Sequence, residues 1–177
     1  MKKILLVALG TVFLITSAGI DLQIPGIPVP QTAQTLALLL VVALLPARLG
    51  VYSVAIYLGL GVLGLPVFSE GGRGLTHLFG NTGGYLIGFL IAALFLEYVL
   101  NQLKLKKILY AFGACVKAHL IILASGWFWL STKVGVAQAY EYGVEPFLIG
   151  AVVKSIPATF ALLFTARLRA VFRKFGL

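Results

Sequence analysis

YLGLGVLGLPVFSEGGRGLTHLFGNTGGYLIGF, residues 57–89, leaves one apolar segment, crosses a polar loop and enters a second apolar segment. The first segment ends at Gly64-Leu65-Pro66-Val67-Phe68, and the second begins at Gly80-Asn81-Thr82-Gly83-Gly84-Tyr85. Half of the chain's 20 glycines lie here. Glycine tolerates positive φ and lets a ligand or another backbone approach closely. The stretch therefore indicates a place where a small molecule is received, with tight turns and close helix packing as an equally open interpretation.

The chain is too apolar for a water-soluble domain. Its 177 residues are 60% hydrophobic and have a mean hydropathy of +1.05, more than a domain of this size can bury. We expect membrane lipid to solvate it. The net charge of +9 does not indicate nucleic-acid binding, because the basic residues occupy short gaps between apolar segments rather than one stripe. The single cysteine, Cys115, excludes an internal disulfide.

Six apolar segments predict an all-α integral membrane protein, a bundle of six transmembrane helices that forms a single domain over residues 1–177. The segments are Ile4–Ile20, Thr32–Leu45, Gly50–Leu65, Gly83–Leu100, Ile108–Leu130 and Pro146–Phe164. A full span needs about 20 residues, so the second segment, which Pro46 ends, is expected to be tilted, kinked or buried against its neighbours. The first segment also resembles a secretory signal peptide, but the five segments that follow favour a retained helix. Pro157 predicts a kink, and three prolines predict an irregular loop over residues 21–31.

Charge in the gaps predicts that both termini are cytoplasmic. With the N-terminus inside, the inner face receives ten of the fourteen basic residues, whereas the outer loops receive only Arg73 and Lys133. This asymmetry is what the positive-inside rule requires. The ten are Lys2, Lys3, Arg48, Lys104, Lys106, Lys107, Arg167, Arg169, Arg173 and Lys174. The proline-rich loop, the glycine-rich loop and the loop over residues 131–145 then share the outer face.

Two lysines lie within the apolar segments, where ionisable groups are expensive and mark function by default. Lys154 lies about 12 Å below the outer end of the last span, at about 1.5 Å per residue. Its ammonium can contact a carboxylate or carbonyl of a ligand, or it can extend to the interface; we favour the ligand. Lys117 lies nearer the middle of its span, where Glu97 is a candidate structural partner.

Other polar residues are weaker candidates. Asn81, Thr82 and Tyr85 place hydrogen-bonding groups where the fourth segment begins. His119 is expected to be a packed helical residue, and His77 a loop residue. Neither histidine has a Cys, Asp or Glu at metal-ligand spacing, so we expect no metal and no cofactor. No glycine-rich run ends in Gly-Lys-Ser/Thr, which indicates that the chain does not hydrolyse ATP itself.

Several motifs in order resemble the BioY family, the biotin-binding S components of energy-coupling-factor vitamin transporters. They are Pro30-Gln31-Thr32-Ala33-Gln34-Thr35, Tyr57-Leu58-Gly59, Gly64-Leu65-Pro66-Val67-Phe68, residues 80–89 (GNTGGYLIGF) and Pro146-Phe147-Leu148-Ile149-Gly150. The resemblance implies a six-helix subunit that captures biotin from outside, beneath its outer loops. It also implies docking on a membrane-embedded coupling protein with two cytoplasmic ATPases, although some family members work without them.

Two positions depart from the family pattern. The last helix of the family reads Gly-Asp-x-x-Lys, with the Asp and Lys both on the ligand; here Lys154 matches the Lys, but Ala151 occupies the Asp position. Asn81 is a candidate replacement acceptor, and weaker affinity or a different ligand are the alternatives. The docking pattern Ala-x-x-x-Ala on the first helix is also incomplete, since Val12 follows Ala8.

The leading hypothesis is a biotin-uptake S component of the plasma membrane, with no catalytic residue. The resemblance implies that Lys154 holds the polar head of biotin, that Asn81, Thr82 and Tyr85 hydrogen-bond it, and that Gln34 and Arg73 come from capping loops. Ala151 is the position that puts the ligand in doubt. Alternatives are an S component for another small vitamin-like ligand, a membrane-embedded enzyme that uses His77 or His119, and a helical scaffold without a ligand.

Overall fold

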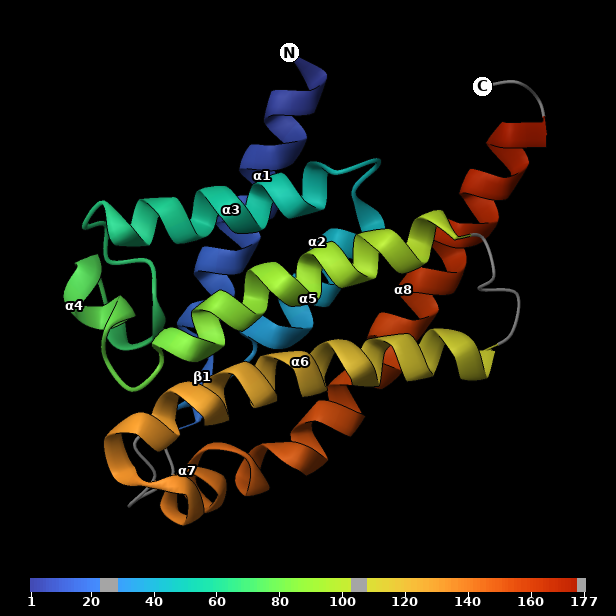
Figure 1. Ribbon diagram of the computed structural model, residues 1–177. Coiled ribbons are helices and arrows are strands. Elements are labelled where there is room, and N and C mark those ends of the chain that lie inside the picture. Colours follow the sequence, from blue (N-terminus) through green and yellow to red (C-terminus); the bar gives the residue numbers. More distant parts are fainter. Residues whose placement is uncertain (23–28, 103–107, 175–177) are drawn as a thin grey trace.

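The computed structural model describes residues 1–22, 29–102 and 108–174; for Leu22 and residues 167–174 it describes the backbone alone. Long helices dominate it (Figure 1), and the six longest define the fold. They are α1 (Lys2–Ala18), α2 (Gln34–Leu44), α3 (Leu49–Val62), α5 (Gly83–Asn101), α6 (Ile108–Val134) and α8 (Leu148–Lys174). Every predicted apolar segment therefore contains one helix. The largest difference is at the end of α8, which continues to Lys174 rather than ending near Phe164.

The long helices are not all long enough to cross a membrane. Three stretches are long and apolar enough to cross a membrane: Gly83–Asn101, Ile108–Val134 and Val136–Ala166. By contrast, α2 has 11 residues and α3 has 14, which correspond to about 16 and 21 Å at 1.5 Å per residue. Neither reaches across a hydrocarbon core of about 30 Å by itself. The structure thus establishes an all-α membrane protein, and six complete spans stay a prediction.

The loops predicted to lie on the outer face contain regular structure that the sequence did not predict. Strands β1 (Asp21–Leu22) and β2 (Gln31–Thr32) pair antiparallel at the two ends of the proline-rich segment. The prediction of an irregular loop over residues 21–31 was therefore wrong at its ends, because the prolines lie between the strands or just before β2 and leave the paired residues free. Pro25 and Pro28 lie outside the described residues.

Two short helices occupy the other predicted loops. The glycine-rich loop contains the 3-10 turn Ser69–Gly71 and α4 (Gly74–Leu78), and the loop over residues 131–145 contains α7 (Val136–Gly143). Gly135 separates α6 from α7 at a φ of 88°, a left-handed conformation that only glycine adopts at little cost. The chain therefore turns sharply between two helices instead of passing through an open loop.

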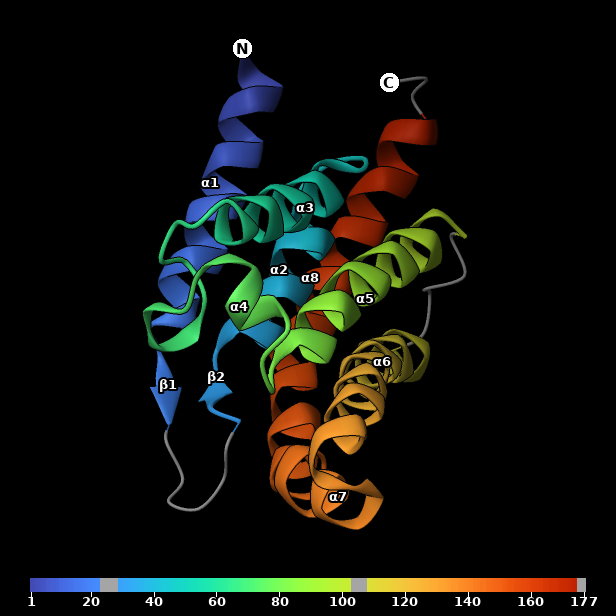
Figure 2. The same cartoon turned by 60° about the vertical axis from the view of Figure 1, so that its left-hand side comes forward.

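Helix α2, the shortest of these six helices, lies at the centre of the bundle. Helix α2 contacts α1, α3, α5 and α8, and its residues Leu38, Leu39 and Val42 are almost fully buried. Figure 2 shows α2 behind α3 and beside α8. Large apolar side chains on the outer helices are exposed instead, for example Phe128 and Phe160, as expected where lipid is the solvent. Because protein surrounds α2, it has no need to be as long as the membrane is thick.

Glycines bring α5 and α6 together. A Cβ added at Gly88 would lie 2.9 Å from Ile122 Cα, and one at Gly84 would meet Trp129 and the Ser125 carbonyl oxygen. Small residues four apart on one helix face are the usual way for membrane helices to approach closely. The packing interpretation of the glycine-rich stretch therefore holds at these two positions.

The elements sort to two ends of the molecule. The start of α1, the α2–α3 turn and the end of α8 lie at one end, and β1, β2 and α7 lie at the other (Figure 2). Arg48 is an exposed residue of that α2–α3 turn. Of the other nine inner basic residues of the prediction, Lys104, Lys106 and Lys107 lie outside the described residues, as do the side chains of the four beyond residue 166.

Candidate functional site

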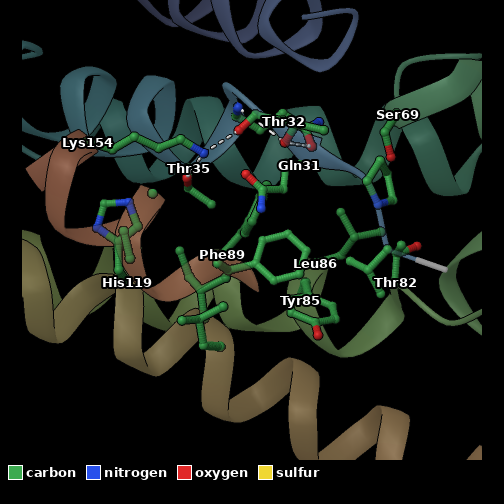
Figure 3. Close-up of a pocket in the computed structure, with 18 of the residues that line it drawn as sticks. Gln31, Thr32, Thr35, Ser69, Thr82, Tyr85, Leu86, Phe89, His119 and Lys154 are labelled. Carbon is green, nitrogen blue, oxygen red and sulfur yellow. Dashed lines mark hydrogen bonds between the residues drawn. The ribbon is translucent and has the colours of Figure 1, made fainter. Parts of the chain in front are cut away.

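A pocket opens beneath β2 and α4, between α2, α5, α6 and α8. It encloses about 690 Å³, including the part that is open to the outside. Its apolar wall consists of Leu86, Phe89, Ile122, Leu123 and Phe147. Polar side chains from β2, α2, α4, α6 and α8, together with Ser69 and Thr82, complete it (Figure 3). An apolar chamber with a few directional polar groups is the usual form of a small-molecule site.

Lys154 supplies the positive charge of the pocket. It is half-buried in α8, and its Nζ donates to the Thr32 carbonyl oxygen at 2.6 Å and to Thr35 Oγ1 at 3.4 Å. An ammonium has three donors, so one is still available to a ligand. Among the described residues that line the pocket there is no Asp or Glu. The charge is therefore suited to an anionic or carbonyl oxygen that enters from outside.

The β2–α2 junction forms the roof near this lysine. Gln34 is buried, and its Nε2 donates to Tyr57 Oη at 2.5 Å while its Oε1 accepts from Thr32 Oγ1 at 3.1 Å. Gln31 Nε2 donates to the carbonyl oxygen of Pro146 at 2.6 Å. Gln31 is therefore bonded to Pro146, and Thr32 to Gln34 and Lys154. Gln34 itself lies in α2 and not, as was predicted, in a capping loop.

Tyr85 lines the pocket with its ring. Its hydroxyl donates to the Gly143 carbonyl oxygen at 2.7 Å and points away from the cavity in Figure 3. Gly126 leaves room for the ring, since a Cβ there would collide with it. The side chain consequently offers a ligand its aromatic face and leaves the hydroxyl engaged with the end of α7.

The outer side of the pocket is formed by His77, Thr82 and Ser69. The His77 ring stacks on Phe68 with centroids 5.2 Å apart, and its Nε2 lies 3.1 Å from Thr82 Oγ1. Burial lowers the pKa of His77, and the nearby Glu70 opposes that shift. His77 therefore enters the site as a neutral side chain at neutral pH.

His119 lines the opposite end, next to Lys154 (Figure 3). Its Nδ1 lies 3.1 Å from the Cys115 carbonyl oxygen and 3.1 Å from Ser155 Oγ. It is a packed helical residue, as the sequence analysis expected, and it also faces the pocket. Among the described residues, no group of three His, Cys, Asp or Glu side chains is arranged to hold a metal.

The structure brings five of the seven predicted site residues together. Lys154, Ala151, Tyr85, Thr82 and Gln34 line the pocket. The other two, Asn81 and Arg73, are exposed and lie outside its wall. Lys117 is also away from the pocket and is exposed, whereas Glu97 is buried and accepts a hydrogen bond from Asn101 Nδ2 at 3.0 Å.

Sequence reasoning missed His119, His77, Ser69, Gln31 and Thr35 as pocket residues. Only Gln31 and Thr35 carried a usable signal, because they lie in the same motif as Gln34. The two histidines were weighed as catalytic or metal-binding groups, and the sequence offers no measure of which way a helical side chain faces across a bundle.

A model of the BioY family matches residues 1–173. The chain is 37% identical over 161 residues to the biotin transporter BioY2 of Lactococcus lactis subsp. cremoris, an alignment that covers 90% of this chain and 87% of the relative. It is 36% identical over 157 residues to the probable biotin transporter BioY of Pyrococcus horikoshii, with coverages of 89% and 91%. Among solved structures it matches the S-component for biotin from an ECF-type ABC transporter, with a TM-score of 0.78, 26% identity and coverages of 96% and 91%.

Proposed function

The chain belongs to the BioY family, and from this premise we propose how it captures its ligand. It is a multi-pass protein of the plasma membrane, the biotin-binding subunit of an ECF transporter, and not an enzyme. The named relatives are biotin transporters, so an S component for another vitamin is not favoured. We propose that biotin occupies the pocket beneath β2 and α4.

One observation carries the assignment of the site: Lys154 places a half-buried cation in an apolar pocket whose described lining contains no carboxylate. The ammonium already donates to Thr32 and Thr35. A carbonyl oxygen of the ligand can take the remaining donor, and a charged hydrogen bond of this kind is worth about 1.5–3 kcal/mol. The ureido carbonyl of biotin is such an oxygen.

The rest of the proposed site follows from the pocket wall. Gln34 holds the roof in place, Thr82 offers a hydroxyl at the outer side, and Tyr85 offers its ring to the bicyclic part of biotin. Ala151 leaves space one turn before Lys154. Asn81 and Arg73 would reach biotin only after a movement of the loops that carry them, so the proposal does not depend on either residue.

We propose a single domain with six membrane crossings and both termini in the cytoplasm. In Figure 2 the start of α1 and the end of α8 lie at the same end of the molecule, which supports an even number of crossings. The excess of Lys and Arg in the predicted inner gaps supports the orientation. The short helices α2 and α3 would complete their crossings together with the turns and strands that flank them.

We further propose that transport uses a membrane-embedded coupling protein and two cytoplasmic ATPases, which some members of the family work without. The absence of a phosphate-binding motif from the sequence supports a separate source of energy. Ala8 and Val12 lie on an exposed face of α1, the helix that the family uses for docking, although Val12 interrupts the usual pattern.

Calorimetry on the detergent-purified protein tests the proposed function. The parent is expected to bind biotin, and Lys154→Ala is expected to bind it roughly ten- to a hundred-fold more weakly. Lys117→Ala is the matched control, because it removes an exposed lysine that is away from the pocket and should leave binding unchanged. A parent that does not bind biotin would overturn the function, and an unchanged Lys154→Ala would remove Lys154 from the site.

A further inference from the structure

His119 presents an unused hydrogen-bonding atom at the inner end of the pocket. The side chain is 3% exposed and comes from α6, and in the pocket it lies beside Lys154 of α8 (Figure 3). Its Nε2 is buried and has no hydrogen-bond partner within the described part of the chain. Buried polar atoms in folded proteins nearly always have a partner, so this atom calls for an explanation.

The contacts of the other ring nitrogen, Nδ1, determine whether Nε2 is a hydrogen-bond donor or an acceptor. Nδ1 lies 3.1 Å from the Cys115 carbonyl oxygen, which can only accept. It also lies 3.1 Å from Ser155 Oγ, whose single hydrogen is donated to the Ala151 carbonyl oxygen at 2.7 Å. Both neighbours therefore require Nδ1 to carry the ring hydrogen. In a neutral imidazole, Nε2 is then an acceptor.

Burial favours the neutral imidazole. The side chain is 3% exposed, so a charged ring would lose its solvation, and the pocket that it lines already holds the ammonium of Lys154. The inner end of the pocket thus pairs one charged donor, Lys154 Nζ, with one neutral acceptor, His119 Nε2. Nε2 is shielded from solvent and belongs to a ring that lines the pocket, so a ligand group packed against this ring is the candidate partner for the atom.

We propose that His119 Nε2 accepts a hydrogen bond from a ureido N–H of biotin while Lys154 Nζ donates to the ureido oxygen. This inference rests on the proposed function and adds an orientation to it. A carboxylate at the same place would satisfy Lys154 but would bring no hydrogen to Nε2. The ureido ring therefore lies at the inner end, and the carboxylate of biotin points toward the mouth of the pocket.

Two substitutions at one position separate ligand binding from a merely structural role. His119→Asn keeps an amide N–H near the place of Nδ1, which can still donate to the Cys115 carbonyl oxygen, but it has no atom where Nε2 lies. His119→Gln is one methylene longer, so its side-chain carbonyl oxygen takes the place of Nε2 while the Nδ1 contact is lost. Biotin affinity and melting temperature without biotin are measured for both variants and the parent.

The proposal predicts that biotin affinity and melting temperature rank the two variants in opposite orders. His119→Asn should bind biotin at least about tenfold more weakly, a change of about 1.4 kcal/mol, with a melting temperature near that of the parent. His119→Gln should bind within about threefold of the parent and melt earlier. An Asn variant that binds like the parent would overturn the inference alone. A parent that does not bind biotin would overturn the proposed function and the inference with it.

Discussion

Ala151 of α8 and His119 of α6 both line the pocket, and of the two only the histidine has a side-chain acceptor. Ala151 is 7% exposed and stands three residues before Lys154 on α8. Residues three apart on a helix are neighbours on its surface, so a longer side chain at position 151 would lie beside that of Lys154. The hydrogen-bonding groups at the inner end of the pocket thus come from Lys154 and His119, with position 151 beside them, and each of these side chains can be replaced separately.

An acceptor added at position 151 should substitute for the one on His119. Ala151→Asp would bring a carboxylate beside Lys154 and within reach of the same ureido N–H. Combined with His119→Asn, it should restore biotin affinity by about tenfold relative to His119→Asn alone, because one good acceptor is worth about 1.4 kcal/mol here. Calorimetry on the two single variants and the double variant measures the coupling. Strictly additive effects would place the two acceptors on different parts of the ligand.

His77 should make the stability of the outer end depend on pH. Burial lowers its pKa in the folded protein, so the unfolded chain takes up a proton first as the pH falls. The free energy of unfolding should therefore be highest above the ordinary histidine pKa of about 6.5 and should decline below it. His77→Gln, which retains a hydrogen-bonding group toward Thr82 without a titrating ring, should show a shallower decline between pH 7.5 and 5 in detergent melts. Equal slopes would contradict this role for His77.

At the scale of the elements, α5 and α6 depend on glycine for their close approach. A Cβ at Gly88 would lie 2.9 Å from Ile122 Cα and 3.0 Å from Ser125 Cβ, whereas one at Gly113 of α6 would meet no atom within 4 Å. The backbone atoms at this crossing cannot move aside as a side chain can. The close packing of α5 and α6, which carry Tyr85, Phe89 and His119, thus depends on position 88 having no Cβ.

Gly88→Ala should lower the melting temperature, because overpacking a close contact costs about 1–3 kcal/mol. Gly113→Ala is the matched control in the same pair of helices. It should be neutral or raise the melting temperature, since alanine is favoured over glycine in a helix by about 0.5–1 kcal/mol. Thermal unfolding in detergent compares them, and equal shifts would show that the crossing has room to spare.

The sequence predicted the main helices, but it did not predict how they pack against one another. Long apolar runs predicted all six main helices, and the prediction for α5 differed from the structure by one residue. Strand β2 and helix α7 were not predicted because neither carries an apolar run of its own: β2 has two residues and forms by pairing with β1, and α7 is a short helix that packs on α6. Lys154 was found because a charge stands out in an apolar segment. The role of His119 was not found, because it depends on how α6 faces α8, and Asn81 and Arg73 show that nearness in sequence does not place a loop residue on a pocket wall.

At the scale of the whole molecule, the proposed topology predicts which surfaces face the cytoplasm. In a Cys115→Ala background, Glu141→Cys on α7 should react with a membrane-impermeant maleimide in intact cells. Arg48→Cys in the α2–α3 turn should react only after the membrane is permeabilised. Both parent residues are exposed, so accessibility within the fold should not limit either reaction. The reverse pattern would invert the topology.

The short central helix also has a consequence for the way the chain enters the membrane. With 11 residues, α2 offers an insertion machinery only about half the apolar length that a helix needs to partition into lipid alone. Its stable place exists once α1, α3, α5 and α8 are present to surround it. We therefore expect α2 to reach a stable place in the membrane only after the later segments that surround it, α8 included, have been synthesised.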